Sequence, residues 1–65
     1  MAKTRFILLK NGEAEQGFNT FADAEKYVCK KESVKRVKWE QEEQGIFFWR
    51  SASHNVWEIE VSVGD

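Results

Sequence analysis

The sequence predicts an α+β fold in which a single helix packs on one face of a four- to five-stranded, mainly antiparallel sheet. A hydrophobic period near 3.6 residues occurs in one segment only, short apolar or alternating runs lie on both sides of it, and turn-forming residues separate those runs. At 65 residues the chain has room for a single domain, residues 1–65. The element order is β(β)αβββ, where the parentheses mark a strand that the pattern leaves open.

The first expected element is a buried strand that ends in a hairpin turn. Residues 5–10 form a short, strongly apolar run. Asn11 and Gly12 follow, and both tolerate the positive φ of a type I′ turn, so they predict a hairpin. The return strand is then Glu13–Phe18, whose acidic residues are typical of a sheet edge that charge protects from pairing with other molecules.

The helix is expected at Phe21–Glu32. The Thr20 hydroxyl can accept a hydrogen bond from a free N–H of the first turn, and Asp23 stands where an approximate capping box needs an acid. At 100° per residue, Tyr27 and Val28 fall on one broad arc with the small residues of the segment, while Lys26 lies opposite. Because the middle of that arc is small, the helix should sit close to the sheet.

After the helix the hydrophobic period changes to two, which indicates strands. The expected elements are a strand at 34–41, a polar turn at 42–45, a strand at 46–49, a loop at 51–55 and a strand at 56–63. Val37 and Trp39 share one face of the first of these strands. The strand at 46–49 is apolar on both faces and is therefore expected in the centre of the sheet or under a cover.

One short helix cannot cover both faces of this sheet, so we expect apolar side chains on the open face. Ile7 and Leu9 are expected there, together with one pair from the strand at 46–49, either Phe47 with Trp49 or Ile46 with Phe48. Three Trp and five Phe exceed what one small core needs, and aromatic rings surrounded by charge are typical of an interface centre. The alternative is that curled strand ends and long charged stems cover the rings.

From this surplus we predict a protein-binding module that acts through the open sheet face. The predicted partner-binding residues are Arg36, Lys38, Phe47, Trp49 and Arg50. The aromatic residues would anchor the partner, and the basic residues would set on-rate and register. The partner is expected to be another protein, and a homodimer through the same surface is an alternative.

The charge distribution supports a second hypothesis, a nucleic-acid-binding domain. Ten basic and eleven acidic residues give a net charge of −1, yet residues 26–38 carry six basic residues and one acid, a local charge of +5. The residues expected to contact phosphates are Lys30, Lys31, Lys35, Arg36 and Lys38, with stacking on neighbouring aromatic rings. The same charges also suit the solvated face and end of a helix. Overall acidity and the glutamates beyond Trp39 argue against this hypothesis, so protein binding is favoured.

Enzymatic, metal-binding and membrane functions have little support in the sequence. Cys29 falls on the packed arc of the helix, His54 in a turn, and the acidic group Glu40, Glu42 and Glu43 shows no buried partner. Phosphate-loop, dinucleotide-binding and zinc-protease motifs are absent, and one Cys with one His cannot form a usual zinc site. We therefore expect no enzyme, no cofactor and no metal. The apolar runs are too short for a membrane span or a secretory signal, and a lone thiol fits the cytoplasm.

The order of elements resembles small phage and mobile-element accessory proteins, including some anti-CRISPR proteins. The residues that carry the resemblance are the helix-entry string GFNTFADAE, residues 17–25, placed between a strand and a strand meander. The resemblance implies a very small non-enzymatic protein that binds and obstructs a larger host or defence complex. It implies no particular site residue. A net charge of −1 is far too small for inhibition by mimicry of DNA.

Overall fold

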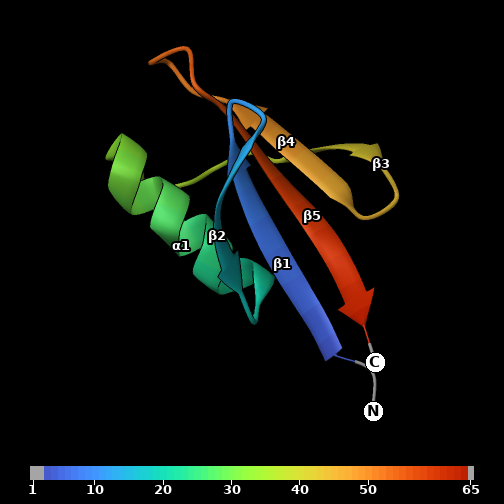
Figure 1. The fold of residues 1–65 in the computed structure, drawn as a ribbon. Helices are drawn as coiled ribbons and strands as arrows, with labels where there is room; N and C mark the ends of the chain where they lie inside the picture. Colours follow the sequence, from blue (N-terminus) through green and yellow to red (C-terminus); the bar gives the residue numbers. More distant parts are fainter. Residues whose placement is uncertain (1–2, 65) are drawn as a thin grey trace.

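The structure, a computed structural model, describes residues 3–64 and has one helix packed against a five-stranded antiparallel sheet. The elements are β1 (Lys3–Lys10), β2 (Glu13–Phe18), α1 (Phe21–Glu32), β3 (Glu40–Glu43), β4 (Ile46–Arg50) and β5 (Val56–Gly64). The strand order is β2-β1-β5-β4-β3, so the long strands β1 and β5 pair in the centre (Figure 1). This architecture confirms the α+β fold and the element order that the sequence predicts.

The first hairpin forms as expected, and its second strand, which the sequence left open, is present as β2. Asn11 and Gly12 have φ values of 53° and 87°, the positive values that a type I′ turn requires. Glu13–Phe18 pairs with β1 along its length, with an irregularity between Leu8 and Leu9. β2 is therefore a true edge strand, and its acidic residues face solvent.

Helix α1 has the predicted bounds because its two ends are capped locally. The Thr20 hydroxyl accepts a hydrogen bond from the Asp23 backbone N–H at 3.1 Å, which starts the helix. At the other end Ser33 adopts the left-handed conformation, and the helix stops there. Ala24 and Val28 are completely buried against the sheet, so the small side chain of Ala24 lets the helix approach closely.

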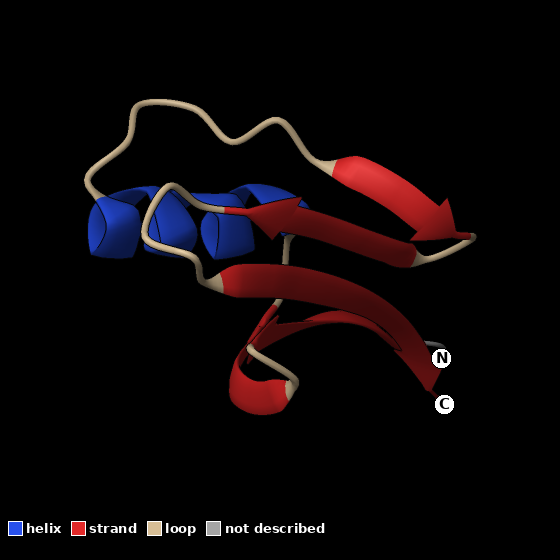
Figure 2. Cartoon of the chain, turned by 90° about the horizontal axis from the view of Figure 1, so that it is seen from above, coloured by secondary structure: helices blue, strands red, loops and turns tan. Residues whose placement is uncertain are grey.

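The expected strand at 34–41 is wrong for residues 34–39, and only Glu40 and Gln41 of it belong to a strand. The chain enters the sheet only at Glu40, and residues 34–39 run as an irregular connection beside α1 (Figure 2). Val37 is buried in the core, and the Trp39 indole N–H donates to the Glu25 carboxylate at 3.0 Å. The alternation in this segment thus reflects packing of Val37 and Trp39 toward the helix and core, without strand pairing.

The expected polar turn at 42–45 is two residues longer than the turn in the structure, which consists of residues 44–45. Glu42 and Glu43 belong to β3, which carries an irregularity between Gln41 and Glu43. The chain reverses at Gln44 and Gly45, where Gly45 has a φ of 82°. A glycine suits that left-handed position because it has no Cβ.

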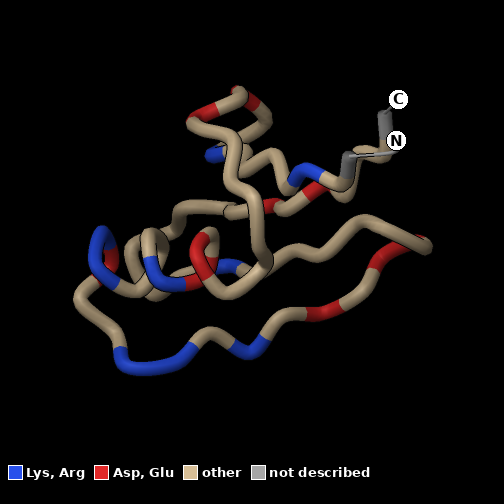
Figure 3. Tube along the Cα trace, turned by 90° about the horizontal axis from the view of Figure 1, so that it is seen from below, with Lys and Arg blue, Asp and Glu red and all other residues tan. Residues whose placement is uncertain are grey.

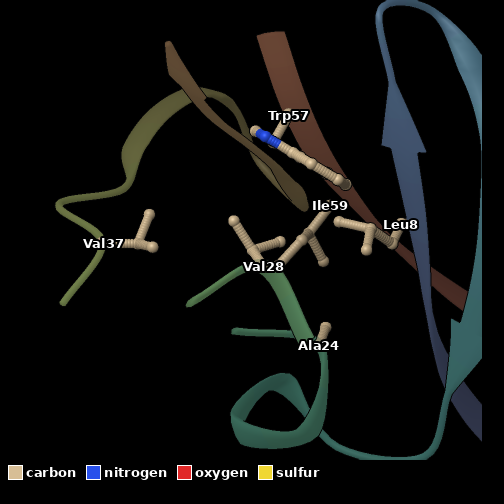
Figure 4. Close-up of a cluster of buried hydrophobic side chains, with 6 residues drawn as sticks. All are labelled: Leu8, Ala24, Val28, Val37, Trp57 and Ile59. Atoms are coloured by element: carbon tan, nitrogen blue, oxygen red, sulfur yellow. The ribbon is translucent and has the colours of Figure 1, made fainter. Parts of the chain in front are cut away.

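The core lies between α1, the connection 34–39 and the covered face of the sheet. It consists of Leu8, Ala24, Val28, Val37, Trp57 and Ile59 (Figure 4). Around it, the Phe21 ring makes edge-on contacts with the rings of Phe6, Trp39 and Phe47, at centroid distances of 6.1, 5.8 and 5.2 Å. Most aromatic rings are therefore partly covered by one another and by the connection, which adds to the cover that the helix gives.

In the part of the chain that the structure describes, neither the end of β5 nor the face of the sheet turned away from α1 is covered by a second layer. Val63 is 67% exposed, because β1 and β5 extend beyond the start of α1. The accessible surface is 4991 Å², against roughly 4,300 Å² for a compact chain of this mass. The excess surface fits an elongated molecule, measuring 39 × 21 × 19 Å, whose single helix packs on only one face of the sheet.

Candidate binding surfaces

The face of the sheet turned away from α1, here called the open face, carries alternating columns of apolar and acidic side chains. Strand register places directly opposite residues on the same face of an antiparallel pair. Two rows cross the strands β1, β5, β4 and β3 in that order: Ile7, Glu60, Ile46 and Glu43, then Leu9, Glu58, Phe48 and Glu40. The columns of β1 and β4 are thus apolar, and those of β5 and β3 are acidic.

The four apolar side chains of the open face are half-buried. Their shelter comes from the neighbouring side chains of the same face, since long charged stems can lie over apolar groups. Among residues 3–64, no helix or loop packs over them (Figure 1). An apolar sheet surface without a second layer is a place where another molecule can bind.

The expectation that Phe47 and Trp49 lie on the open face is wrong. Both side chains pack against the core cluster, and their opposite residues on β5 are Ile59 and Trp57. Of the Phe and Trp rings, only Phe48 belongs to the open face. The pattern of residues 46–49 could not decide this because both of its faces are apolar.

A hollow of about 490 Å³ lies at the edge of the sheet where β4 extends past β3, and side chains from both faces of β4 line it. It forms because β3 begins only at Glu40, so beyond Phe48 β4 is paired with β5 alone and has no strand on its other side. The hollow brings together three of the five predicted partner-binding residues, Lys38, Trp49 and Arg50, and also has Glu40, Phe48 and Val56 in its lining. Phe47 lies on the other face of the sheet, and Arg36 is on the connection outside this hollow.

The basic residues expected to contact phosphates are exposed and lie on the helix side of the molecule. Lys30 and Lys31 are in the last turn of α1, and Lys35, Arg36 and Lys38 are on the connection that runs beside it (Figure 3). The Lys31 ammonium also lies 5.5 Å from the centre of the Tyr27 ring. A second hollow, of about 510 Å³, lies between α1 and β2 and is lined by Arg5, Lys26 and Lys30 together with Asp23 and Tyr27.

Glu32 joins several distant residues by hydrogen bonds, and the sequence does not predict this role. Its carboxylate accepts hydrogen bonds from the Trp57 indole N–H at 2.7 Å and from the Asn55 amide at 3.0 Å. These bonds, that of Asn55 first, lower the pKa of Glu32, and partial burial opposes them. Asn55 also accepts from Asn11, so one carboxylate ties the helix end to two turns of the sheet. The spacing of these residues, 23 to 44 positions apart, leaves no local signal.

The residues with reactive side chains lie in ordinary surroundings. Cys29 is half-buried against the core, and burial raises the pKa of its thiol, with a further rise from the nearby Glu25 carboxylate. His54 is exposed at a positive φ of 65° in the loop before β5. Within the described part of the chain, no three His, Cys, Asp or Glu side chains gather where they could hold a metal ion.

In residues 3–64 no helix has the length and apolar character needed to cross a membrane. Comparison of the chain with protein-family models, with curated proteins and with solved structures found no match.

Proposed function

We propose that this protein is a non-enzymatic protein-binding module that acts through the open face of its sheet. The observation that carries the proposal is the uncovered pair of apolar columns formed by Ile7 and Leu9 on β1 and by Ile46 and Phe48 on β4. Apolar groups of this size lose contact with water when a partner covers them, which stabilises a complex. The adjoining hollow offers the partner a recess beside these columns.

The resemblance to phage accessory proteins implies that the bound partner is a larger host or defence complex, which this protein would inhibit. A domain of 65 residues can obstruct a larger machine only by occupying one of its surfaces, so a binding face is sufficient for that role. The single thiol suits a reducing compartment such as the cytoplasm.

The proposal is tested by comparative capture from cells that carry the gene. The immobilised wild-type protein is compared with Phe48→Ser, which alters the open face, and with Lys30→Glu, a control on the opposite side of the molecule. We expect a protein that the wild type and Lys30→Glu retain and that Phe48→Ser releases. Equal capture by all three proteins would exclude the open face as the binding surface.

We propose nucleic-acid binding as the second candidate function. The observation in its favour is the separation of charge: exposed basic residues on α1 and the connection, and glutamates on β3 and β5 (Figure 3). A phosphate backbone that follows the connection would meet Lys35, Arg36 and Lys38 in succession.

The second candidate is tested with labelled single- and double-stranded oligonucleotides at about 50 and 200 mM salt. If nucleic acid binds through the basic side, the logarithm of the affinity should fall as the logarithm of the salt concentration rises. The double variant Lys35→Glu with Arg36→Glu should abolish binding. The Phe48→Ser variant is the matched control and should bind like the wild type. Absence of binding at about 50 mM salt excludes this function.

A further inference from the structure

We infer that the occupant of the open face is a basic amphipathic helix of another protein, lying along β4. The inference rests on the proposed function, because it names the chemistry of the partner that the same face binds. It depends on the order in which apolar and acidic columns alternate across the strands.

The apolar column of β4 has an acidic column on each side. Ile46 lies opposite Glu60 on β5 and Glu43 on β3, and Phe48 lies opposite Glu58 and Glu40 in the same way. Neighbouring strands are about 4.8 Å apart, so the backbones that carry these glutamates lie at nearly equal distances on the two sides of the Ile46 and Phe48 column. The face is therefore a narrow apolar strip between two acidic borders.

A basic amphipathic helix has the complementary pattern. Its apolar stripe repeats at three- and four-residue spacing, about 4.5 to 6 Å along the axis, close to the roughly 6.7 Å between alternate residues of a strand. Lys and Arg residues on both flanks of such a stripe would reach the carboxylates of β5 on one side and of β3 on the other. The apolar stripe would then cover Ile46 and Phe48.

Arg50 limits the position of that helix. It follows Phe48 in the same column of β4 and lies opposite Val56, so the acidic borders end at this point. A basic residue of the partner placed there would meet a like charge. The basic part of the partner should therefore lie over the two rows that contain glutamates, with an acidic or neutral residue toward Arg50.

Other occupants fit the charges or the apolar strip less well. The open face of a second copy would bring Glu58 and Glu60 against the same carboxylates. The basic side of a second copy has the right charge, but Val37 of its connection is buried and cannot cover Phe48. A nucleic acid or an acidic peptide would be repelled by both borders.

The test uses two labelled synthetic helical peptides of 18 residues that share a leucine stripe and differ only in its flanks, lysine in one and glutamate in the other. Fluorescence anisotropy measures the binding of each to the folded protein. We expect the lysine peptide to bind the wild type. Phe48→Ser, Glu58→Lys and Glu60→Lys should each weaken it about tenfold, while Glu13→Lys, the same charge change away from the open face, should change affinity less than about twofold.

Charge reversal gives an independent check, since the variant with both Glu58→Lys and Glu60→Lys should prefer the glutamate peptide. Binding of the glutamate peptide to the wild type, lost in Phe48→Ser, would overturn the inference and leave the open face as a docking surface. If Phe48→Ser affects neither peptide, the inference is also wrong. The proposed function then still depends on the separate capture experiment, in which Phe48→Ser must release the partner.

Discussion

At the scale of single residues, Glu32 links parts of the chain that are distant in sequence. Its carboxylate holds Trp57 and Asn55, and Asn11 in turn donates to Asn55 and accepts from the Val56 backbone N–H at 2.9 Å. The Trp57 side chain is almost fully buried, and its indole N–H donates to the Glu32 carboxylate. Glu32 therefore stabilises the fold, although nothing in the sequence distinguishes it from an ordinary surface glutamate.

Replacing Glu32 should destabilise the protein in a pH-dependent manner. Glu32→Ala leaves the buried N–H of Trp57 unpaired and should lower the free energy of unfolding by about 2 kcal/mol at neutral pH. The folded-state pKa lies below the usual 4.5, so this contribution is complete above 4.5 and is lost as pH falls through the lowered folded value. Urea unfolding monitored by Trp fluorescence measures it. A difference between wild type and Glu32→Ala that does not shrink in acid would contradict the assignment.

Truncation of the neighbouring residues Phe48 and Trp49 should destabilise the protein to different extents. Trp49→Ala removes a ring that packs on the core and should cost about 2–4 kcal/mol of stability. Phe48→Ala acts on the open face and should cost less than about 1.5 kcal/mol. Chemical denaturation of both variants measures the difference. The reverse order would place Phe48 in the core and remove the main support for the docking surface.

At the scale of elements, local signals predict most of the fold and fail where packing decides. The hairpin turn at Asn11 and Gly12 and the capped helix Phe21–Glu32 follow from short motifs, and the structure has both. Residues 34–39 show the alternation of a strand because the side chains of Val37 and Trp39 both face the core. Only backbone hydrogen bonds to a neighbouring strand, which this segment lacks, would distinguish a strand from a covering segment. The same limit applies to residues 46–49, whose buried side is set by the register with β5.

The end of α1 offers a stabilising substitution. Ser33 has φ 56° and ψ 43°, a left-handed conformation that strains any residue with a Cβ. Ser33→Gly should raise the free energy of unfolding by about 1 kcal/mol, since glycine adopts this conformation freely. Ser33→Ala is the control and should give no such gain. Thermal unfolding followed by circular dichroism compares them, and equal stability of both variants would mean that the left-handed turn carries no strain.

At the scale of the whole molecule, acidic groups lie where sheets usually associate. The edge strand β3 is Glu-Gln-Glu-Glu and fully exposed, and the opposite edge β2 carries Glu13 and Glu15. On the open face, glutamates form two of the four columns that run from β1 to β3. Charged edges oppose strand addition between copies, and matching acidic columns oppose face-to-face pairing. We therefore expect the open face to resist self-association and to favour the basic partner proposed above.

This arrangement predicts a protein that stays monomeric at neutral pH until the central acidic column is removed. Sedimentation should show a monomer at about 100 µM, which bounds any dimer affinity at about −5.5 kcal/mol. Changing Glu58→Leu and Glu60→Leu together joins the apolar columns of β1 and β4 into one continuous surface, so this variant should dimerise below that concentration. Adding Phe48→Ser to it should restore the monomer. A wild-type dimer that Phe48→Ser dissociates would show instead that the open face binds a second copy despite its carboxylates.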